Sequence, residues 1–600
     1  MEGKALLKRA MAERKLELVD AATASFGRAR QHFRSAEDYV RGSTLLTVAG
    51  RIPLAGDIVG VRVRAVTGVA EMGVALADAG DQASAIDRVF IKPSGHNPGA
   101  GVLLGLLQDI QPRVQPLRDD FVRAVSAAST VDETVLPGAQ RQGFIDARAT
   151  VAKAATAANQ FEQLSPFLMD IVGGKGRRTY LVEQVNPAEL RAGGGFIGTV
   201  SLVQLEAGNF KLLFSGDVSE FDHYSGRIDT PGHVAPPAGP DYVAPPNAFT
   251  DWYKGQSWYF ADSNLFPDFA TNAKWGAFFA KRLQGVQIDG VISLDYYAVA
   301  AMLDTTGPIA LPKFGVTLDS KNFVSQVLSL DISNDPIHKP IIAEAAKDLM
   351  GKVSSLPADR WPSLIQVIGE SARARHFQLA FEDPVIQTQI SRLGWTSTLN
   401  PEKTADFLYE TEDNLGGTKG NPFLTRRYAL NLTRVAGSLH HKLTVDFDYR
   451  PPAGVHLLDH YYAYVRFYAK EPMTNVTLRK TSSEYTALIP PPYPDTGAPS
   501  GYKVSDGWIF IDAGPGHSGH MQLTLEYDTP WTADASGKHA LMWEKQPGTE
   551  QDKVAVSWTA GQKTFSATTT LDQDRLISIG PRGIAVAPAG SSVAVPSLGF

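Results

Sequence analysis

The 600-residue chain contains no cysteine. This absence excludes disulfides, thiolate metal sites and a cysteine nucleophile. It is compatible with an exported protein that avoids oxidisable thiols, and equally with a cytosolic protein of a thermophile. Long runs of lysine and arginine are also missing, and the sequence pI is about 6.1. Nucleic acid is therefore not an expected partner.

Long hydrophobic runs are missing as well. The most apolar early stretch, residues 45–66, is interrupted by arginines, a proline and an aspartate, whereas a membrane-spanning helix needs about 18 uninterrupted apolar residues. No P-loop, HExxH, EF-hand or nucleophile-elbow pattern occurs, which removes support for the common NTPase and hydrolase functions. Two GxGxxG matches, beginning at Gly193 and Gly514, each precede a strand pattern, whereas a dinucleotide fold requires a helix there.

The length of the chain is too great for one hydrophobic core, so we expect roughly two to four domains. Residues 1–165 are predicted to form an α-helical bundle or stalk. Apolar residues there alternate spacings of three and four over residues 19–40, 69–90 and 144–161, which is the pattern of left-handed helix packing. The bundle is interpreted either as a spacer or assembly surface for protein partners, or as a plain packed core.

Residues 166–420 are predicted to form an α/β domain, because strand patterns alternate with helix patterns. A proline-rich segment, residues 223–256, separates two of these elements and is interpreted as a lid or binding loop, since unstructured loops of this length are uncommon. The strands are expected over residues 180–185, 199–206, 210–214 and 288–294, and the helices over residues 270–283 and 296–304.

The last part of the chain alternates apolar and polar residues with a period of two. Residues 421–580 therefore predict an antiparallel β-sandwich. Residues 581–600 are rich in alanine, proline, serine and valine and are expected to form a flexible tail. The whole chain is thus predicted to be a multidomain α+β protein.

The candidate site begins where the strand over residues 180–185 ends. The segment from Asn186 to Gly198 reads NPAELRAGGGFIG. Its glycines, Gly194 among them, would allow the backbone to approach a ligand closely. Glu189 and Arg191 are interpreted either as an ion pair at the end of the strand or as part of an anion site, in which the planar guanidinium grips two diphosphate oxygens.

Acidic residues are expected at two places near this strand end. Asp268 precedes a predicted helix that carries Lys274, and it is interpreted either as a helix cap or as a Mg²⁺ ligand. Asp217 ends the second strand of the predicted hairpin, at the sheet edge where Arg191 should also lie. Acidic residues beside an arginine at one sheet edge fit a site for a metal and a diphosphate. The alternative is that these acidic residues are ordinary solvated surface side chains.

Several spaced motifs resemble the bacterial cell-envelope proteins of the domain of unknown function 4012 family. Members of that family carry an N-terminal membrane anchor, so the resemblance implies a location at the extracytoplasmic face and an anchor outside the given residues. The motifs span residues 186–198, 262–264, 267–269, 288–295, 303–308, 412–419 and 545–548, and they include Asn264, Asn414 and Lys419.

The central region is also similar to the LytR-CpsA-Psr phosphotransferases, which move glycopolymers from polyprenyl-diphosphate carriers to the cell wall. In that family one strand ends in Arg-Ser-Asp and a later strand ends in Ile-Pro-Arg-Asp. Arg191 stands at the first of these positions, and Ser215-Gly216-Asp217 stands at the second, keeping the aspartate but not the arginine.

The resemblance implies roles for particular residues. Arg191 and Asp217 are expected to be catalytic, and Asp217 and Asp268 are expected to bind Mg²⁺. The expected substrate-binding residues are Asn186, Glu189, Arg191, Gly194, Asn264, Lys274, Asn414 and Lys419.

Two functions follow as hypotheses. The first is a cell-envelope protein that binds a polyprenyl-diphosphate-linked glycan or a cell-wall glycopolymer; whether it also transfers the glycan, as a phosphotransferase would, is left open. The second is a non-catalytic scaffold of a surface or export system. A long apolar tunnel beside Arg191 would favour the first hypothesis, and a closed core there would favour the second.

Overall fold

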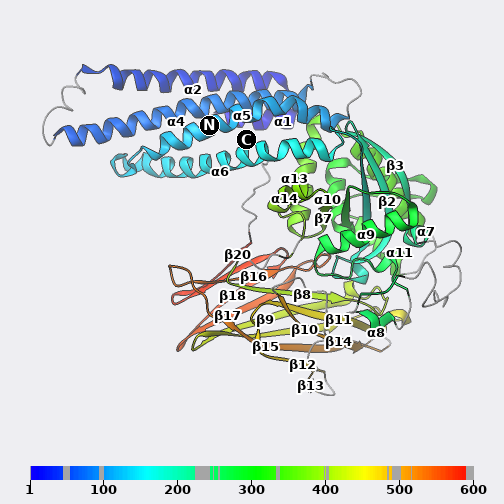
Figure 1. Cartoon of the computed structure of the whole chain (residues 1–600). Helices are drawn as coiled ribbons and strands as arrows, with labels where there is room; N and C mark the ends of the chain where they lie inside the picture. The colour runs from blue at the N-terminus through cyan, green and yellow to red at the C-terminus, as the bar shows by residue number, and fades with distance from the viewer. Residues whose placement is uncertain are drawn as a thin grey trace.

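The structure is a computed structural model in which a helical bundle, an α/β core and a two-sheet β-domain follow one another along the chain (Figure 1). The bundle and the β-domain both extend from the core, which lies at one end of the molecule. The predicted α+β class, with helices at the N-terminus, is confirmed. The residues described are 2–44, 55–93, 101–222, 243–246, 249–253, 257–332, 338–397, 399, 404–482, 486–488, 502–514 and 517–589. Most of the predicted loop 223–256 lies outside these ranges.

The bundle is built from long helices that pack in chain order, α2 on α4, α4 on α5 and α5 on α6. The three segments with alternating apolar spacing lie in α2, α4 and α6, as predicted. Among the described residues, no helix combines the length and the hydropathy that a membrane crossing requires. The helices are α1 (Glu2–Glu13), α2 (Leu16–Gly42), α4 (Ala55–Ile91), α5 (Val102–Ser129) and α6 (Gly138–Ile171).

Two glycines of α4 set the distance between α2 and α4. A Cβ atom added at Gly80 would lie 2.5 Å from the ring of Phe26, and one added at Gly73 would lie 2.5 Å from the ring of Phe33. The two phenylalanines are seven residues apart in α2, and the two glycines are seven residues apart in α4. Seven residues are about two helical turns, so the same contact between a ring and a glycine repeats two turns along the helices. The close packing of these helices therefore depends on positions without a side chain.

The last bundle helix continues past the expected end of the bundle at residue 165. Helix α6 contains Pro166 and ends at Ile171. Proline lacks the N–H that would bond to the carbonyl of Glu162 four residues earlier. The hydroxyl of Ser165 donates to that carbonyl over 3.3 Å, and this bond offsets the missing one.

The core contains a five-stranded sheet in the order β3-β2-β1-β4-β7. Strands β1 and β4 are parallel, and the other neighbours are antiparallel. Helix α9 covers one face, and helices α10 to α13 cover the other face and share a hydrophobic cluster with the bundle. The strands are β1 (Arg178–Asn186), β2 (Phe196–Glu206), β3 (Asn209–Asp217), β4 (Gly290–Asp295) and β7 (Phe377–Phe381). A separate small hairpin comprises β5 (Ile309–Leu311) and β6 (Val316–Leu318).

The helices of the core match the two that were predicted and add several more. The expected helix over residues 270–283 is α9, and the one over residues 296–304 is α10. The helices are α7 (Val218–Phe221), α8 (Thr250–Tyr253), α9 (Phe269–Gln284), α10 (Tyr296–Thr306), α11 (Phe323–Ile332), α12 (His338–Ser354), α13 (Trp361–Arg373) and α14 (Pro384–Arg392).

The β-domain consists of two sheets whose inner faces share one hydrophobic cluster, which is the arrangement of a sandwich. The seven-stranded sheet has the order β13-β12-β15-β10-β9-β17-β18, and the six-stranded sheet has the order β14-β11-β8-β16-β19-β20. The first sheet contains β9 (Leu424–Val435), β10 (Ser438–Tyr449), β12 (Thr474–Thr481), β13 (Thr486–Leu488), β15 (Gly519–Pro530), β17 (Asp552–Ala560) and β18 (Lys563–Leu571). The second contains β8 (Asp406–Asp413), β11 (His460–Lys470), β14 (Tyr502–Asp512), β16 (His539–Glu544), β19 (Arg575–Gly580) and β20 (Gly583–Pro588).

Three details of the sandwich differ from the sequence expectation. Strand β8 belongs to the six-stranded sheet although it precedes the expected boundary at residue 420. Strand β20 lies inside the expected flexible tail and pairs with β19. Each sheet also contains one parallel pair, β8 with β16 and β9 with β17. These strands return from distant parts of the chain, and the period of two does not encode strand direction.

We expect Gly80→Ala to lower the melting temperature of the protein. Alanine favours a helix by up to about 1 kcal/mol relative to glycine, but the clash with Phe26 should cost about 1–3 kcal/mol. Gly27→Ala is the control, because a Cβ there meets nothing within 4 Å, and it should raise the melting temperature. Equal increases in both variants would show that Gly80 is not a packing constraint.

Candidate functional site

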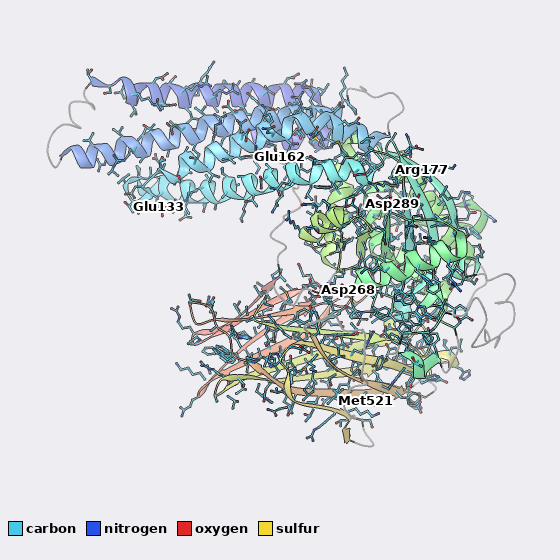
Figure 2. All side chains as sticks on the ribbon, in the orientation of Figure 1. Glu133, Glu162, Arg177, Asp268, Asp289 and Met521 are labelled. Atoms are coloured by element: carbon cyan, nitrogen blue, oxygen red, sulfur yellow. The ribbon has the colours of Figure 1, made fainter. Side chains whose placement is uncertain are left out.

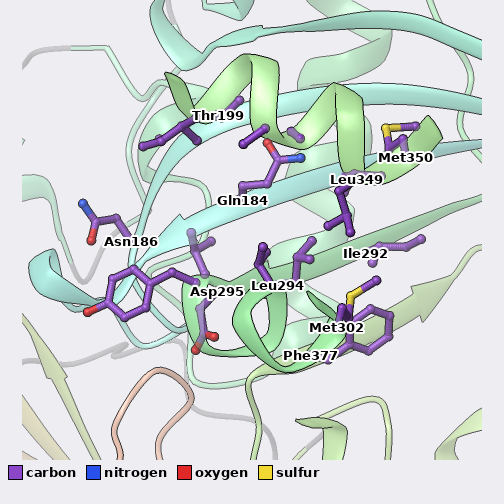
Figure 3. Close-up of a pocket in the computed structure, with 18 of the residues that line it drawn as sticks. Gln184, Asn186, Thr199, Ile292, Leu294, Asp295, Met302, Leu349, Met350 and Phe377 are labelled. Atoms are coloured by element: carbon purple, nitrogen blue, oxygen red, sulfur yellow. The ribbon is translucent and has the colours of Figure 1, made fainter. Parts of the chain in front are cut away.

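A largely apolar cavity of about 270 Å³ lies between the core sheet and helices α10, α11 and α12. The period of two along the strands explains its position. On β1, Leu181 belongs to the cluster under α9, whereas Tyr180 and Val182 line the cavity on the opposite face. Helix α12 closes the cavity from above with apolar side chains that include Leu349 and Met350 (Figure 3).

The mouth of the cavity is polar. Strands β1 and β4 run parallel, so their carboxyl ends meet at one edge of the sheet, where β3 also ends and β2 begins. This edge brings together side chains from four strands and from the loop after β8. In Figure 3, Asn186 and Asp295 lie toward one end of the cavity, and Ile292 and Met350 lie toward the other. The polar lining residues are Gln184, Asn186, Thr199, Asp217, Asp295 and Lys419.

Asp295 connects the mouth to a histidine that sequence reasoning missed. One carboxylate oxygen of Asp295 accepts hydrogen bonds from the backbone N–H groups of Tyr297 and Ala298 and caps α10. The other lies 2.6 Å from Nδ1 of His376. The sequence pattern places Asp295 at the end of a strand. His376 lies 81 residues later, directly before another strand, and no local pattern links the two residues.

Arg191 lies in the interior, between the core and the sandwich. Its side chain is 5% exposed. Its Nη2 atom donates to Glu189 over 2.8 Å, and Nη1 donates to the backbone carbonyl of Asn414. Burial opposes the charge of Arg191, but nearby carboxylates, foremost that of Glu189, outweigh it and raise the pKa of the guanidinium.

One aromatic ring separates Arg191 from the cavity. The guanidinium carbon of Arg191 lies 5.8 Å from the ring centroid of Phe196, and Phe196 itself lines the cavity. Arg191 does not line the cavity. Arg191 therefore forms the ion pair with Glu189 that was one of the two interpretations of the sequence. This ion pair lies directly behind the cavity wall.

The three consecutive glycines after Arg191 approach protein rather than open space. A Cβ atom added at Gly193 would lie 2.7 Å from the backbone oxygen of Asn264, and one added at Gly195 would lie 2.3 Å from the backbone of Asn186. Gly194 has φ +115° and faces Pro547 of the sandwich. The absence of side chains thus allows the turn at residues 547–548 to pack against the core.

Three other predicted binding residues lie away from the cavity. Asn264 is buried and donates to the carbonyl of Gly195 over 2.6 Å. Asn414 is buried and donates to the carbonyl of Thr418 over 2.7 Å. Lys274 is exposed on α9, which covers the face of the sheet opposite the cavity.

The two aspartates expected to bind Mg²⁺ occupy different settings. Asp217 lines the cavity mouth and accepts from the backbone N–H of Ser219 at the start of α7. Asp268 caps α9 by accepting from Thr271, and it lies at the side of the core next to the sandwich (Figure 2). Within the described residues there is no group of three or more acidic or histidine side chains arranged to hold a metal.

The structure thus brings together three of the predicted site residues. Asn186, Asp217 and Lys419 line the mouth of the same cavity. Glu189 adjoins them, because one of its carboxylate oxygens lies 3.9 Å from Nζ of Lys419. Arg191, Gly194, Asn264 and Asn414 lie in the interior behind this mouth, and Lys274 and Asp268 belong to α9 and its cap.

A buried glutamate occupies the other face of β1. Glu183 is 1% exposed, and neither carboxylate oxygen has a hydrogen-bond partner among the described residues. Its neighbour on β4 in the register is Ser293, and Gly276 of α9 passes over it. Burial raises the pKa of Glu183 from 4.5 to about 8, so the carboxyl is largely protonated at neutral pH.

Comparison with known proteins identifies one family for this region. Residues 175–330 match the family model described as "Protein of unknown function (DUF4012)". The match begins just before β1 and ends within α11, so it contains four strands of the core sheet and much of the cavity wall. No curated protein and no solved structure matches the chain.

We expect Arg191→Ala to lower the melting temperature strongly. Removing one partner of a buried ion pair leaves Glu189 with only the more distant ammonium of Lys419 to offset its charge, and breaking a buried pair costs roughly 3–5 kcal/mol. Arg427→Ala is the matched control, because Arg427 is 49% exposed and pairs with Asp448 on the surface; its loss should cost less than about 1 kcal/mol. An unchanged melting temperature for Arg191→Ala, with lost binding of a polyprenyl diphosphate, would instead identify Arg191 as a ligand clamp.

We expect Glu183→Gln to stabilise the protein increasingly as pH rises. The folded state binds the Glu183 proton more tightly than the unfolded state, so Glu183 lowers stability between about pH 4.5 and pH 8, and the penalty is complete above that window. The penalty grows by up to about 1.4 kcal/mol per pH unit. The difference in melting temperature between variant and parent should be small at about pH 5 and largest at about pH 9. A difference independent of pH would contradict the raised pKa.

Proposed function

We propose that the core binds a lipid-linked glycan of the polyprenyl-diphosphate class at the extracytoplasmic face of the cell envelope. The observation that carries the proposal is the apolar cavity with its polar mouth. In this proposal the lipid occupies the cavity and the diphosphate lies at the mouth, near Lys419 and Asn186. The family match over residues 175–330 agrees with the resemblance to the domain of unknown function 4012 family, and a cell-envelope location and a LytR-CpsA-Psr-like core are part of the proposal.

The lining of the cavity suits a flexible, branched hydrocarbon chain. Its inner part is formed by aliphatic and aromatic side chains, including Leu205, Val327 and Phe323. Met302 and Met350 add unbranched side chains that adapt to irregular shapes. A cavity of about 270 Å³ is close to the roughly 300–1,000 Å³ that ligand pockets occupy. It would hold part of a polyprenyl chain, with the remainder leaving through an opening.

The mouth offers hydrogen-bond donors for a phosphate group. Lys419 supplies an ammonium, Asn186 an amide and Thr199 a hydroxyl. Asp217 and Asp295 add carboxylates to the same mouth, which limits the anionic charge that it can hold. Mg²⁺ binding by Asp217 and Asp268 stays a prediction. Each of the two aspartates caps a helix, α7 and α9 respectively, and the proposal includes no step through a metal.

The proposal is limited to binding. Transfer requires cations that neutralise charge developing on the diphosphate, and the arginine expected to supply this charge is enclosed by Glu189 and by the backbone of Asn414. The scaffold hypothesis is supported by the same observation, since Arg191 joins the core to the loop that follows β8. A chain that binds a lipid-linked glycan without transferring it would combine the two hypotheses.

The proposal predicts that filling the cavity abolishes lipid binding. Ala346 of α12 lines the cavity, and Ala343 of the same helix does not. Ala346→Phe should weaken binding of geranylgeranyl diphosphate, measured by titration calorimetry, by at least about tenfold, or about 1.4 kcal/mol. Ala343→Phe should bind with nearly the affinity of the parent protein.

Two results would contradict the proposal. One is equal affinity of the parent and Ala346→Phe, which would place the lipid elsewhere. The other is the absence of any binding by the parent protein, which would favour the scaffold function. Geranylgeraniol, which has the same chain without the diphosphate, should bind more weakly than the diphosphate if Lys419 contributes at the mouth.

A further inference from the structure

A second cavity, which we call the polar cleft, lies where the core meets the sandwich. It has a volume of about 370 Å³ and is lined almost entirely by polar side chains. Clefts between domains are common positions for ligand sites. The core contributes residues of α10, α13 and the start of β7, and the sandwich contributes the loop before β17 and the turn between β18 and β19. The main lining residues are Tyr297, Glu370, Arg373, His376, Glu550 and Asp572.

Neighbouring side chains hold the carboxylates of the cleft in place. Glu370 accepts from the amide of Gln366 over 2.9 Å. Glu550 accepts from the hydroxyl of Tyr297, and Asp572 accepts from Arg575. Each of these contacts uses one carboxylate oxygen, and a carboxylate can accept about four hydrogen bonds. Each acid therefore has a partner on one oxygen and keeps the capacity to accept hydrogen bonds from a ligand.

The floor of the cleft is fixed by a buried charged cluster. Arg375 is 5% exposed and contacts Glu544 over 2.7 Å and Asp574 over 2.9 Å. Lys545 of the sandwich donates to the carbonyl of Ala374 over 2.9 Å. These contacts join the core and the sandwich at residues that adjoin the lining residues in the sequence. They fix the two walls of the cleft relative to each other, which lowers the entropy that a ligand site loses on binding.

The polar cleft and the apolar cavity share a wall. Asp295 lines the apolar cavity, and His376, whose Nδ1 lies 2.6 Å from it, lines the polar cleft. Likewise, Tyr296 lines the apolar cavity and Tyr297 lines the polar cleft, and their ring centroids are 4.6 Å apart. Because Asp295 engages Nδ1, the other nitrogen of His376 remains as its second hydrogen-bonding atom.

We infer that the polar cleft binds the glycan of the lipid-linked ligand, and that it selects a neutral glycan. This inference rests on the proposed function and adds a second subsite to it. Sugars are recognised through their hydroxyl groups, which need closely spaced acceptors and donors. The cleft supplies carboxylates, an imidazole and a guanidinium, together with the amide side chains of Gln551 and Gln573.

The charges of the cleft decide between neutral and anionic sugars. Glu370, Glu550 and Asp572 bring three carboxylates to the lining, and two guanidinium groups oppose them: that of Arg373 in the lining and that of Arg575, which pairs with Asp572. One negative charge is therefore left in excess. A uronic acid would place a further negative charge beside these groups, and like charges at short distance repel. Neutral hexoses and N-acetylhexosamines avoid this repulsion, and their hydroxyl groups donate to the carboxylates.

The test measures binding of glycans without a lipid. The probes are neutral tetrasaccharides of glucose, mannose and N-acetylglucosamine, with a tetramer of galacturonic acid as the anionic counterpart. The parent protein should bind at least one neutral tetramer at least about tenfold more tightly than the anionic one. The double variant Glu370→Ala/Gln573→Ala should lose about tenfold or more in that affinity. Asp304→Ala, which removes an exposed carboxylate of α10 outside the cleft, should bind as the parent does.

The outcomes separate this inference from the proposed function. Unchanged glycan affinity in the double variant, with an unchanged melting temperature, would overturn the glycan subsite. So would the failure of the parent protein to bind any neutral tetramer at millimolar concentration, or tighter binding of the anionic tetramer. The double variant should still bind geranylgeranyl diphosphate. Loss of geranylgeranyl diphosphate binding only in Ala346→Phe would support the lipid cavity, whatever the glycan result.

Discussion

A buried carboxylate of strand β8, that of Asp413, joins the sandwich to the core, and the adjacent Glu412 fixes β8 within the sandwich. Glu412 and Asp413 are both fully buried. Arg426 of the sandwich contacts both oxygens of Glu412, over 2.9 and 2.7 Å. Asp413 pairs with Arg466 and accepts from the backbone N–H of Ala192 in the core over 2.8 Å. Burying such charges is costly, and it is tolerated when every charge has partners in good geometry.

The positions of the proposed sites depend on this junction. Ala192 is the neighbour of Arg191, and the amide of Gln546 donates to the carbonyl of Arg191 over 3.1 Å and to that of Glu412 over 2.8 Å. The backbone that follows β1 is therefore fixed from the sandwich side. Lys419, in the loop after β8, reaches the mouth of the apolar cavity, and the loop before β17 forms one wall of the polar cleft. Both cavities are built from more than one part of the chain.

The sequence predicted individual helices and strands better than it predicted the contacts between distant segments. Alternating apolar spacings identified three of the bundle helices, and the period of two identified strands of the sandwich, because these patterns are local. Gly194 was predicted to let the backbone approach a ligand closely, and in the structure Pro547, more than three hundred residues later, lies against it. No local pattern reports such a contact, so the approach was assigned to a ligand.

The candidate site was predictable only in part for the same reason. Asn186 and Asp217 could be placed at one sheet edge from strand ends alone, and both line the cavity. The cavity itself needs α12, which carries no motif, and His376 joins the site through a contact with Asp295 that only the tertiary fold creates. The domain boundary at residue 420 was misplaced because β8 is buried along its whole length and shows no alternation of burial.

The match to the family model covers only part of the unit that these contacts hold together. The region that matches the family model ends in α11, before α12 closes the cavity, before β7 completes the sheet and before β8 supplies Asp413. A fragment with those limits would leave Arg191 and Glu189 facing solvent on one side and the apolar wall open on the other. The matched region therefore marks a stretch of recognisable sequence, whereas the contacts that complete the sheet, the cavity wall and the surroundings of Arg191 extend into the sandwich.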